Sequence, residues 1–245
     1  MCSSHMAHPS GPAQRDMYRQ VDASTMDGEN IVEVGGKRPE IDPTAYVDPS
    51  ARVIGNVILE QGTAVYPGVV LRAEDATILV RRNAVILDMS FLEAPAGTEV
   101  VIGEATLISH RVTLHGAQVG SSTLVGVGTI LLDRAIVGNE CIVSAGSLVP
   151  PRREVADRSL VVGSPVRFKR NLSDADVERI RAHHRVAWEK ARAYGQMYGS
   201  NPMDRMTSGL GDVRVDPELF PGAPEKLKRK MGQKFRRVDF DTWDF

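Results

Sequence analysis

The sequence has few aromatic residues, only two cysteines and no long apolar run. Aromatic side chains make up 5% of the 245 residues, so the core must come from the aliphatic part of the 42% hydrophobic fraction. Cys2 and Cys141 lie far apart without a pairing pattern, which argues against a disulfide scaffold and favours a cytoplasmic chain in which Cys141 is a small buried side chain. The lack of a bilayer-length apolar run, or of a charged-then-apolar start, predicts neither a membrane span nor a signal peptide.

Neither sign of charge predominates. The 30 lysine and arginine residues nearly balance the 31 aspartate and glutamate residues, and the formal net charge is −1. A chain without a strong overall field has no general attraction for nucleic acid or for an anionic membrane surface. We therefore expect a small-molecule substrate and no nucleic-acid or membrane partner.

What the sequence does have is a period of six. Aliphatic residues recur at this spacing, with short slips, at Ile41, Val47, Val53, Leu59, Val65, Leu71, Val80, Ile86, Leu92, Ile102, Ile108, Leu114, Val119, Val125, Leu131, Val137 and Val143. This period fits neither an amphipathic helix nor a simple hairpin sheet. It predicts short strands joined by tight turns, stacked so that each coil pairs with the coils above and below it. Glycines that follow these positions, such as Gly103 and Gly120, are expected where a turn needs positive φ or close backbone approach.

Several ordered motifs carry a resemblance to a known family. They are Val70-Leu-Arg72, Ile108-Ser-His110, Leu114-His-Gly116, Val125-Gly-Val-Gly128, Ala145-Gly-Ser-Leu-Val-Pro-Pro151 and Ser159-Leu-Val-Val-Gly-Ser-Pro165. The stretch from about 38 to 170 resembles the hexapeptide-repeat proteins, and among them the gamma-class carbonic anhydrase group with its bacterial relatives in phenylacetate and carnitine operons. The resemblance implies an all-β solenoid, a left-handed parallel β-helix over 31–170, with a C-terminal α-helix and an extended C-terminal arm. It also implies a homotrimer with active sites between subunits.

The ends of the chain follow other patterns. Residues 1–30 are polar and without usable periodicity, and we expect a flexible N-terminal arm. Ser173-Asp-Ala-Asp176 resembles a capping box, and apolar residues at helical spacing follow it, so a C-terminal helix is expected within 171–200. The resemblance implies that this helix packs along the wall of the β-helix.

Residues 201–245 form a C-terminal extension beyond the usual family length. The extension holds a basic cluster at Lys226-Leu-Lys-Arg-Lys230 and an acidic, aromatic end at Asp239-Phe-Asp-Thr-Trp-Asp-Phe245. Its basic cluster has no interleaved aromatic residues, which favours a solvated helix and a tail that docks on a neighbouring subunit over a nucleic-acid or anionic-ligand arm. The third alternative is that these lysines bind an anionic acyl-CoA substrate.

Two histidines five residues apart, His110 and His115, are not explained by packing of the repeat. The family resemblance implies a zinc or ferrous iron ion held by three histidines between two subunits, and these two match the second and third ligands. Three protein ligands leave a fourth position open for hydroxide or substrate. The position of the first ligand is occupied by Glu93, giving two histidines and one carboxylate.

Other residues depart from the family pattern as well. Leu87 stands where a glutamine orients the attacking hydroxide, whereas the neighbouring Asp88 is retained and is expected to orient or relay a proton. The resemblance implies that Arg72, followed by Glu74, pairs with an acidic residue across a subunit interface. It also makes Glu99, in a short loop, the candidate for a proton shuttle.

These residues favour one function and leave two alternatives open. The first is a metal-dependent lyase or hydrolase of the gamma-carbonic-anhydrase type, whose metal-bound hydroxide attacks CO2 or a different small carbonyl or CoA-thioester substrate. The second is an acyltransferase in which His115, or His110, acts as a general base without metal. The third is a trimeric scaffold without catalytic activity.

Overall fold

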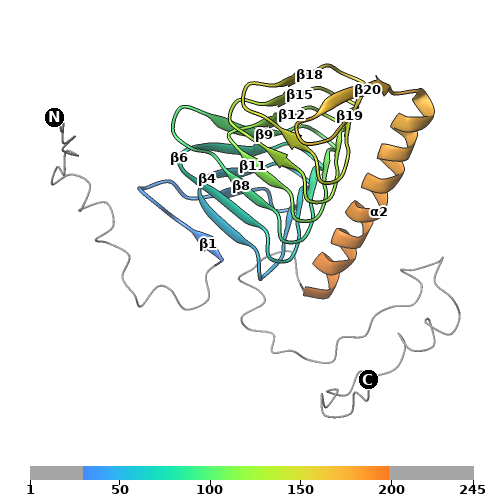
Figure 1. Ribbon diagram of the computed structural model, residues 1–245. Helices are drawn as coiled ribbons and strands as arrows, with labels where there is room; N and C mark the ends of the chain where they lie inside the picture. The colour runs from blue at the N-terminus through green and yellow to red at the C-terminus, as the bar shows by residue number, and fades with distance from the viewer. Residues whose placement is uncertain (1–29, 199–245) are drawn as a thin grey trace, which may run out of the picture.

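The computed structural model describes residues 30–198, and within them the chain winds into a left-handed parallel β-helix with one long helix along its wall (Figure 1). The coils stack on one another, so that their strands line up into three faces. The helix face holds β3 (Tyr46–Val47), β5 (Ala64–Val65), β7 (Val85–Ile86), β10 (Leu107–Ile108), β13 (Leu124–Val125), β16 (Ile142–Val143) and β19 (Ser159–Val162), ending in the antiparallel β20 (Arg167–Asn171).

The other two faces share one sheet. The His115 face holds β8 (Phe91–Glu93), β11 (Thr113–His115), β14 (Ile130–Leu131) and β17 (Leu148–Val149), and the Glu99 face holds β2 (Glu40–Ile41), β9 (Glu99–Ile102), β12 (Gln118–Val119), β15 (Ile136–Val137) and β18 (Glu154–Val155). Two long strands, β4 (Arg52–Leu59) and β6 (Val70–Val80), run from the first of these faces onto the second, and β1 (Ile31–Val32) pairs with β4.

The period of six is the period of inward-pointing side chains. In the column of parallel pairs on the His115 face, Leu71, Leu92 and Leu114 are fully buried, as is Leu131 in the next coil. Their neighbours on either side point outward because side chains alternate along a strand. Regular coils repeat every 18 residues, as in the pairing of Leu124 with Ile142, which is three repeats of six. The predicted fold is confirmed.

The period slips where the chain passes from the His115 face to the Glu99 face. In β4 and β6 the strand continues through the corner, and the register shifts between Gly55 and Val57. A Cβ at Gly55 would lie 2.4 Å from the carbonyl oxygen of Ala73. The backbones of adjacent coils therefore approach closely at this corner, which only glycine permits.

Three glycines stack at the corner that leads into the helix face. A Cβ at Gly120 would lie 2.6 Å from the backbone carbon of Gly138, and one at Gly103 would lie 2.4 Å from that of Gly120. None of these three residues has positive φ, so close approach is the reason for glycine here.

We expect Gly120→Ala to destabilise the protein by about 1–3 kcal/mol or more, because the neighbouring backbone has to move. Gly128→Ala is the control, because Gly128 has positive φ but nothing within 4 Å of an added Cβ, and it should cost only about 1 kcal/mol. Urea unfolding followed by circular dichroism measures both. Equal losses in the two variants would contradict the packing explanation.

The helix α2 (Asp174–Tyr198) packs against β3, β5, β7 and β10. Its first turn has the predicted reciprocal cap, in which the Ser173 backbone N–H donates to the Asp176 carboxylate at 2.9 Å and the Asp176 N–H donates to the Ser173 hydroxyl at 3.3 Å. The Tyr66 hydroxyl donates to the Ala187 carbonyl at 2.5 Å, which ties the helix to the residue that follows β5. Within residues 30–198, no helix has the length and apolar composition that crossing a membrane requires.

The buried carboxylate of Asp176 makes acid stability testable. Hydrogen bonds from the Arg170 guanidinium and from Ser173 hold the pKa of Asp176 well below its usual range, with a further contact from Arg179. A carboxylate whose pKa is lowered by folding stabilises the native state above its unfolded pKa of about 4, and this contribution is lost as the pH falls through the native pKa.

We therefore expect Asp176→Asn to lower the melting temperature at pH 7, and the gap from the wild type to narrow as the pH is lowered below 4. Asp174→Asn is the matched control on the same turn, since Asp174 is 95% exposed and its pair with Arg158 contributes little. Melting temperatures of the wild type and both variants, measured from pH 7 to below pH 4, test this prediction. A gap that stays constant with pH would contradict the role of the charge.

Candidate functional site

The two histidines singled out in the sequence lie in two separate polar clusters. His110 follows β10, in the turn between the helix face and the His115 face. The pairing of β7 with β10 places it directly beside Asp88 of the preceding coil, and the Arg111 N–H donates to the Asp88 carbonyl at 2.9 Å. The His110 Nδ1 lies 3.0 Å from the Asp88 Oδ2. Asp88, which was expected from the sequence to orient or relay a proton, thus lies beside a histidine, and its role in proton transfer stays a prediction.

This pairing fixes the chemistry of His110. A carboxylate at Nδ1 favours the tautomer with the proton on that nitrogen, so that Nε2 carries the free lone pair. Side-chain exposures of 49% for His110 and 38% for Asp88 leave the ring accessible. A histidine oriented by a carboxylate, with an accessible Nε2, is the arrangement that a general base requires.

His110 and Asp88 line a groove of about 600 Å³ between α2 and the helix face, which we call the corner groove. Its apolar lining comes from Leu87, Leu107, Leu124, Val127, Val186 and Ala187. The helix also contributes Lys190 and His183 to this groove. The groove therefore combines a histidine–carboxylate pair, an apolar wall and a cation.

His115 belongs to a second cluster, on the outer surface of the His115 face. Its Nδ1 lies 3.0 Å from the Asp133 Oδ1, and its Nε2 lies 3.9 Å from the Glu93 Oε2. Glu93 accepts a hydrogen bond of 2.6 Å from the Arg72 guanidinium, which also lies over the Phe91 ring. The hydrogen bond to Glu93 raises the pKa of Arg72 above its usual value despite partial burial.

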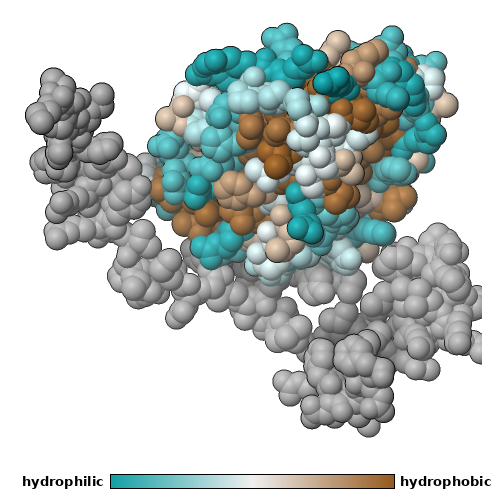
Figure 2. Space-filling model, in the orientation of Figure 1, coloured by the Kyte–Doolittle hydropathy of each residue, from teal (hydrophilic) through white to brown (hydrophobic). Residues whose placement is uncertain are grey.

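The face around this second cluster is rich in apolar side chains. Outward positions on β14 and β17 carry Ile130, which is 41% exposed, and the half-buried Leu148. Figure 2 shows hydrophobic and pale side chains among polar ones on the side turned to the viewer, where β8 and β11 are labelled in Figure 1. The charged cluster is thus set in a mixed, partly apolar surface.

The predicted metal ligands come together only in part. Glu93 and His115 are register partners on adjacent strands, as expected for two ligands of one ion. His110, however, pairs with Asp88 around the corner, and the Glu93 carboxylate already binds a guanidinium. Residues 30–198 contain no group of three histidine, cysteine or acidic side chains able to hold a metal ion. The donor set of a single chain therefore does not fit a three-ligand centre.

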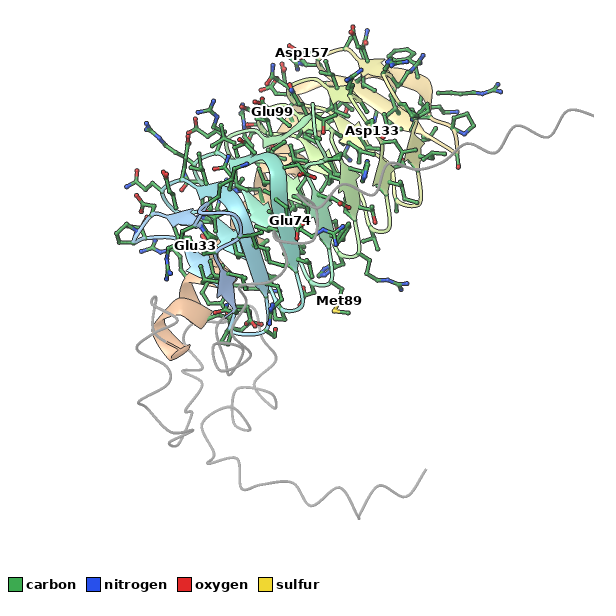
Figure 3. The ribbon with its side chains drawn as sticks, turned by 90° about the vertical axis from the view of Figure 1, so that its left-hand side faces the viewer. Glu33, Glu74, Met89, Glu99, Asp133 and Asp157 are labelled. Atoms are coloured by element: carbon green, nitrogen blue, oxygen red, sulfur yellow. The ribbon has the colours of Figure 1, made fainter. Side chains whose placement is uncertain are left out.

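Glu99 and Glu74 join neither histidine cluster. Glu99 begins β9 on the Glu99 face, because the loop that precedes it carries the chain around the corner. Glu74 lies on β6, where that strand turns between faces. Figure 3 shows both apart from Asp133 of the His115 cluster and from Met89, which neighbours Asp88. The proton-shuttle role of Glu99 and the pairing of Arg72 across an interface stay predictions, and Arg72 pairs with Glu93 of its own chain.

Two residues of the site, Asp133 and Lys190, were not predicted from the sequence. Asp133 lies 18 residues after His115, which is one regular coil, so the period itself could have identified it. Lys190 faces the groove from α2, and no spacing within the repeat signals a contact between the repeat and a helix 80 residues further along the chain. His184 of α2 lies outside both clusters, and its Nε2 is 2.6 Å from the Asn83 carbonyl oxygen.

Comparisons with known proteins agree with this architecture. No protein-family model matches the chain. The chain is 32% identical over 187 residues to the carnitine operon protein CaiE of Escherichia coli, covering 76% of this chain and 95% of the relative. A Proteus relative of the same name is 33% identical over 149 residues, which cover 61% of this chain and 76% of that protein.

Two crystal structures are also similar. A hexapeptide transferase family protein from Anaplasma phagocytophilum aligns with a TM-score of 0.64 at 28% identity, covering 67% of this chain and 97% of its own. A Bacillus cereus structure aligns with a TM-score of 0.67 at 22% identity over 68% of this chain and 96% of its own. The second likeness shows the fold alone.

Proposed function

We propose that this chain, which belongs to the family of the bacterial carnitine operon protein CaiE, transfers the acyl group of a coenzyme A thioester to an alcohol, an amine or water, with His110 as the general base. The observation that carries this proposal is the His110–Asp88 pair in the lining of the corner groove. The likeness to a hexapeptide transferase family structure supports the reaction class.

The proposed reaction needs one base and no redox partner. The His110 Nε2 takes the proton of the acceptor as its oxygen or nitrogen forms a bond to the thioester carbonyl carbon. The tetrahedral intermediate then collapses, the carbon–sulfur bond breaks, and the imidazolium returns its proton to the leaving thiolate. Asp88 keeps the ring in the required tautomer and stabilises the imidazolium.

Two features favour His110 over His115 as the base. The His115 Nε2 faces the Glu93 carboxylate, and its Nδ1 faces Asp133, so both ring nitrogens already lie near acceptors. His115 is also absent from the lining of the corner groove, whereas His110 is part of it. The alternative in which His115 acts as the base stays a prediction, which the thiol-release assay described below can test.

The metal-dependent lyase or hydrolase also remains a prediction. It would need His110 of a second chain beside Glu93 and His115, because one chain keeps these residues in separate clusters. Elemental analysis of purified full-length protein for zinc and iron separates the hypotheses, since the proposed acyl transfer needs neither metal.

The reaction itself is tested by incubating the full chain with acyl-CoA and small alcohols or amines, and following free thiol with a chromogenic reagent. We expect thiol release that depends on enzyme and that continues in the presence of a chelator. A chain that releases no coenzyme A with any acceptor, water included, would overturn the proposal.

A further inference from the structure

The corner groove also indicates the substrate class. We infer that it selects acyl-CoA thioesters whose acyl group is apolar and longer than acetyl, and that Lys190 binds an anionic part of the same molecule. This inference rests on the proposed function, because it assigns the thioester carbonyl to His110.

The apolar wall is the first observation. Leu87, Leu107 and Leu124 come from three successive coils of the helix face. Val127 and Val186 complete the wall, and they are 46% and 53% exposed, among the most exposed large hydrophobic side chains of residues 30–198. Leaving such side chains in water is unfavourable, and an apolar ligand lying between them would cover both.

The charges in the groove are the second observation. Its titratable side chains are Tyr66, Asp88, His110, His183, Lys190 and Tyr194. Asp88 is the only carboxylate among them, and it is paired with His110. The Lys190 ammonium has no carboxylate within ion-pair distance among the described residues. The groove therefore favours a ligand that is apolar at one end and anionic at the other, as an acyl-CoA is.

Smaller substrates would use little of this surface. Carbon dioxide or an acetyl group bound beside His110 could contact Val127, its neighbour in the next coil, but is too small to fill a groove of about 600 Å³. Each methylene buried in the groove should strengthen binding by about three- to fourfold. Affinity is therefore expected to rise with acyl chain length until the groove is filled.

Calorimetric titration tests the inference without turnover. Full-length protein carrying His110→Ala is titrated with acetyl-, butyryl-, hexanoyl- and octanoyl-CoA. We expect the dissociation constant to fall by at least tenfold from acetyl to hexanoyl. Equal affinities across the series would overturn the inference. The role of His110 in the reaction is tested separately, by the turnover of the His110→Ala variant.

Single substitutions test where in the groove the acyl chain and the anionic part of the ligand bind. Val127→Asp and Val186→Asp, both at exposed positions, should remove the chain-length dependence, whereas Ile136→Asp on the Glu99 face, 42% exposed, should retain it. Lys190→Gln should weaken binding of every acyl-CoA about equally, and Lys169→Gln on β20 should not. Unchanged hexanoyl-CoA binding in both valine variants would place the acyl group elsewhere. Failure of all four thioesters to bind would overturn this inference and the proposed function together.

Discussion

A His110→Ala variant is expected to release coenzyme A from acyl thioesters about 10²- to 10⁴-fold more slowly than the wild type, which is the usual contribution of a general base. His110 is half exposed and lies in a turn, so its replacement should leave the fold intact. Initial rates measured with a thiol reagent, beside melting temperatures of both proteins, check the expectation. A rate within a few-fold of the wild type would remove His110 from the reaction.

The Asp88→Asn variant tests whether Asp88 holds the His110 ring in the tautomer that proton transfer requires. The amide can donate to Nδ1, which would place the imidazole proton on Nε2 and leave no free lone pair there. We expect kcat to fall while the affinity for acyl-CoA stays the same. Asp133→Asn is the matched control, because it removes the equivalent carboxylate from His115, and it should leave turnover unchanged.

The largest expected effect on stability comes from the inward column of the coils. Leu131→Ala should destabilise the protein by about 2–5 kcal/mol, because it opens a cavity among fully buried side chains. Its neighbour Ile130 is 41% exposed on the same strand, and Ile130→Ala should cost no more than about 0.5 kcal/mol in the isolated chain. Urea unfolding of both variants measures the difference.

A loss at Ile130 as large as that at Leu131 would mean that the outer surface of β14 is also buried in solution. Such a result would point to packing between copies on the His115 face, as the predicted homotrimer requires. Sedimentation analysis of both variants would show whether subunit association accompanies the loss of stability.

The fold followed from the sequence because a repeating coil is a local structure. Leu92, Leu114 and Leu131 each point inward for the same reason, namely the position of each within six residues. The start of α2 was also predictable, since the cap between Ser173 and Asp176 lies within four consecutive residues.

Less of the site than of the fold could be predicted from the sequence, because the site depends on how neighbouring coils are aligned. A fixed spacing of 18 residues, one regular coil, links His115 to Asp133. The slips in the period put 22 residues between Asp88 and His110, so the same spacing does not find that pair. The pairing of Arg72 with Glu93 depends on a side-chain contact across 21 residues. The corner groove needs the position of α2, which no pattern within the repeat encodes.

The central claim is that acyl transfer depends on His110 and Asp88 and not on a metal ion. The most direct test is the rate of coenzyme A release by the full chain before and after exhaustive removal of metal with a chelator. Our account predicts the same rate in both samples, with zinc or iron added back having no effect. Loss of the rate on chelation, with recovery on adding zinc or ferrous iron, would contradict it and favour a metal centre at Glu93 and His115.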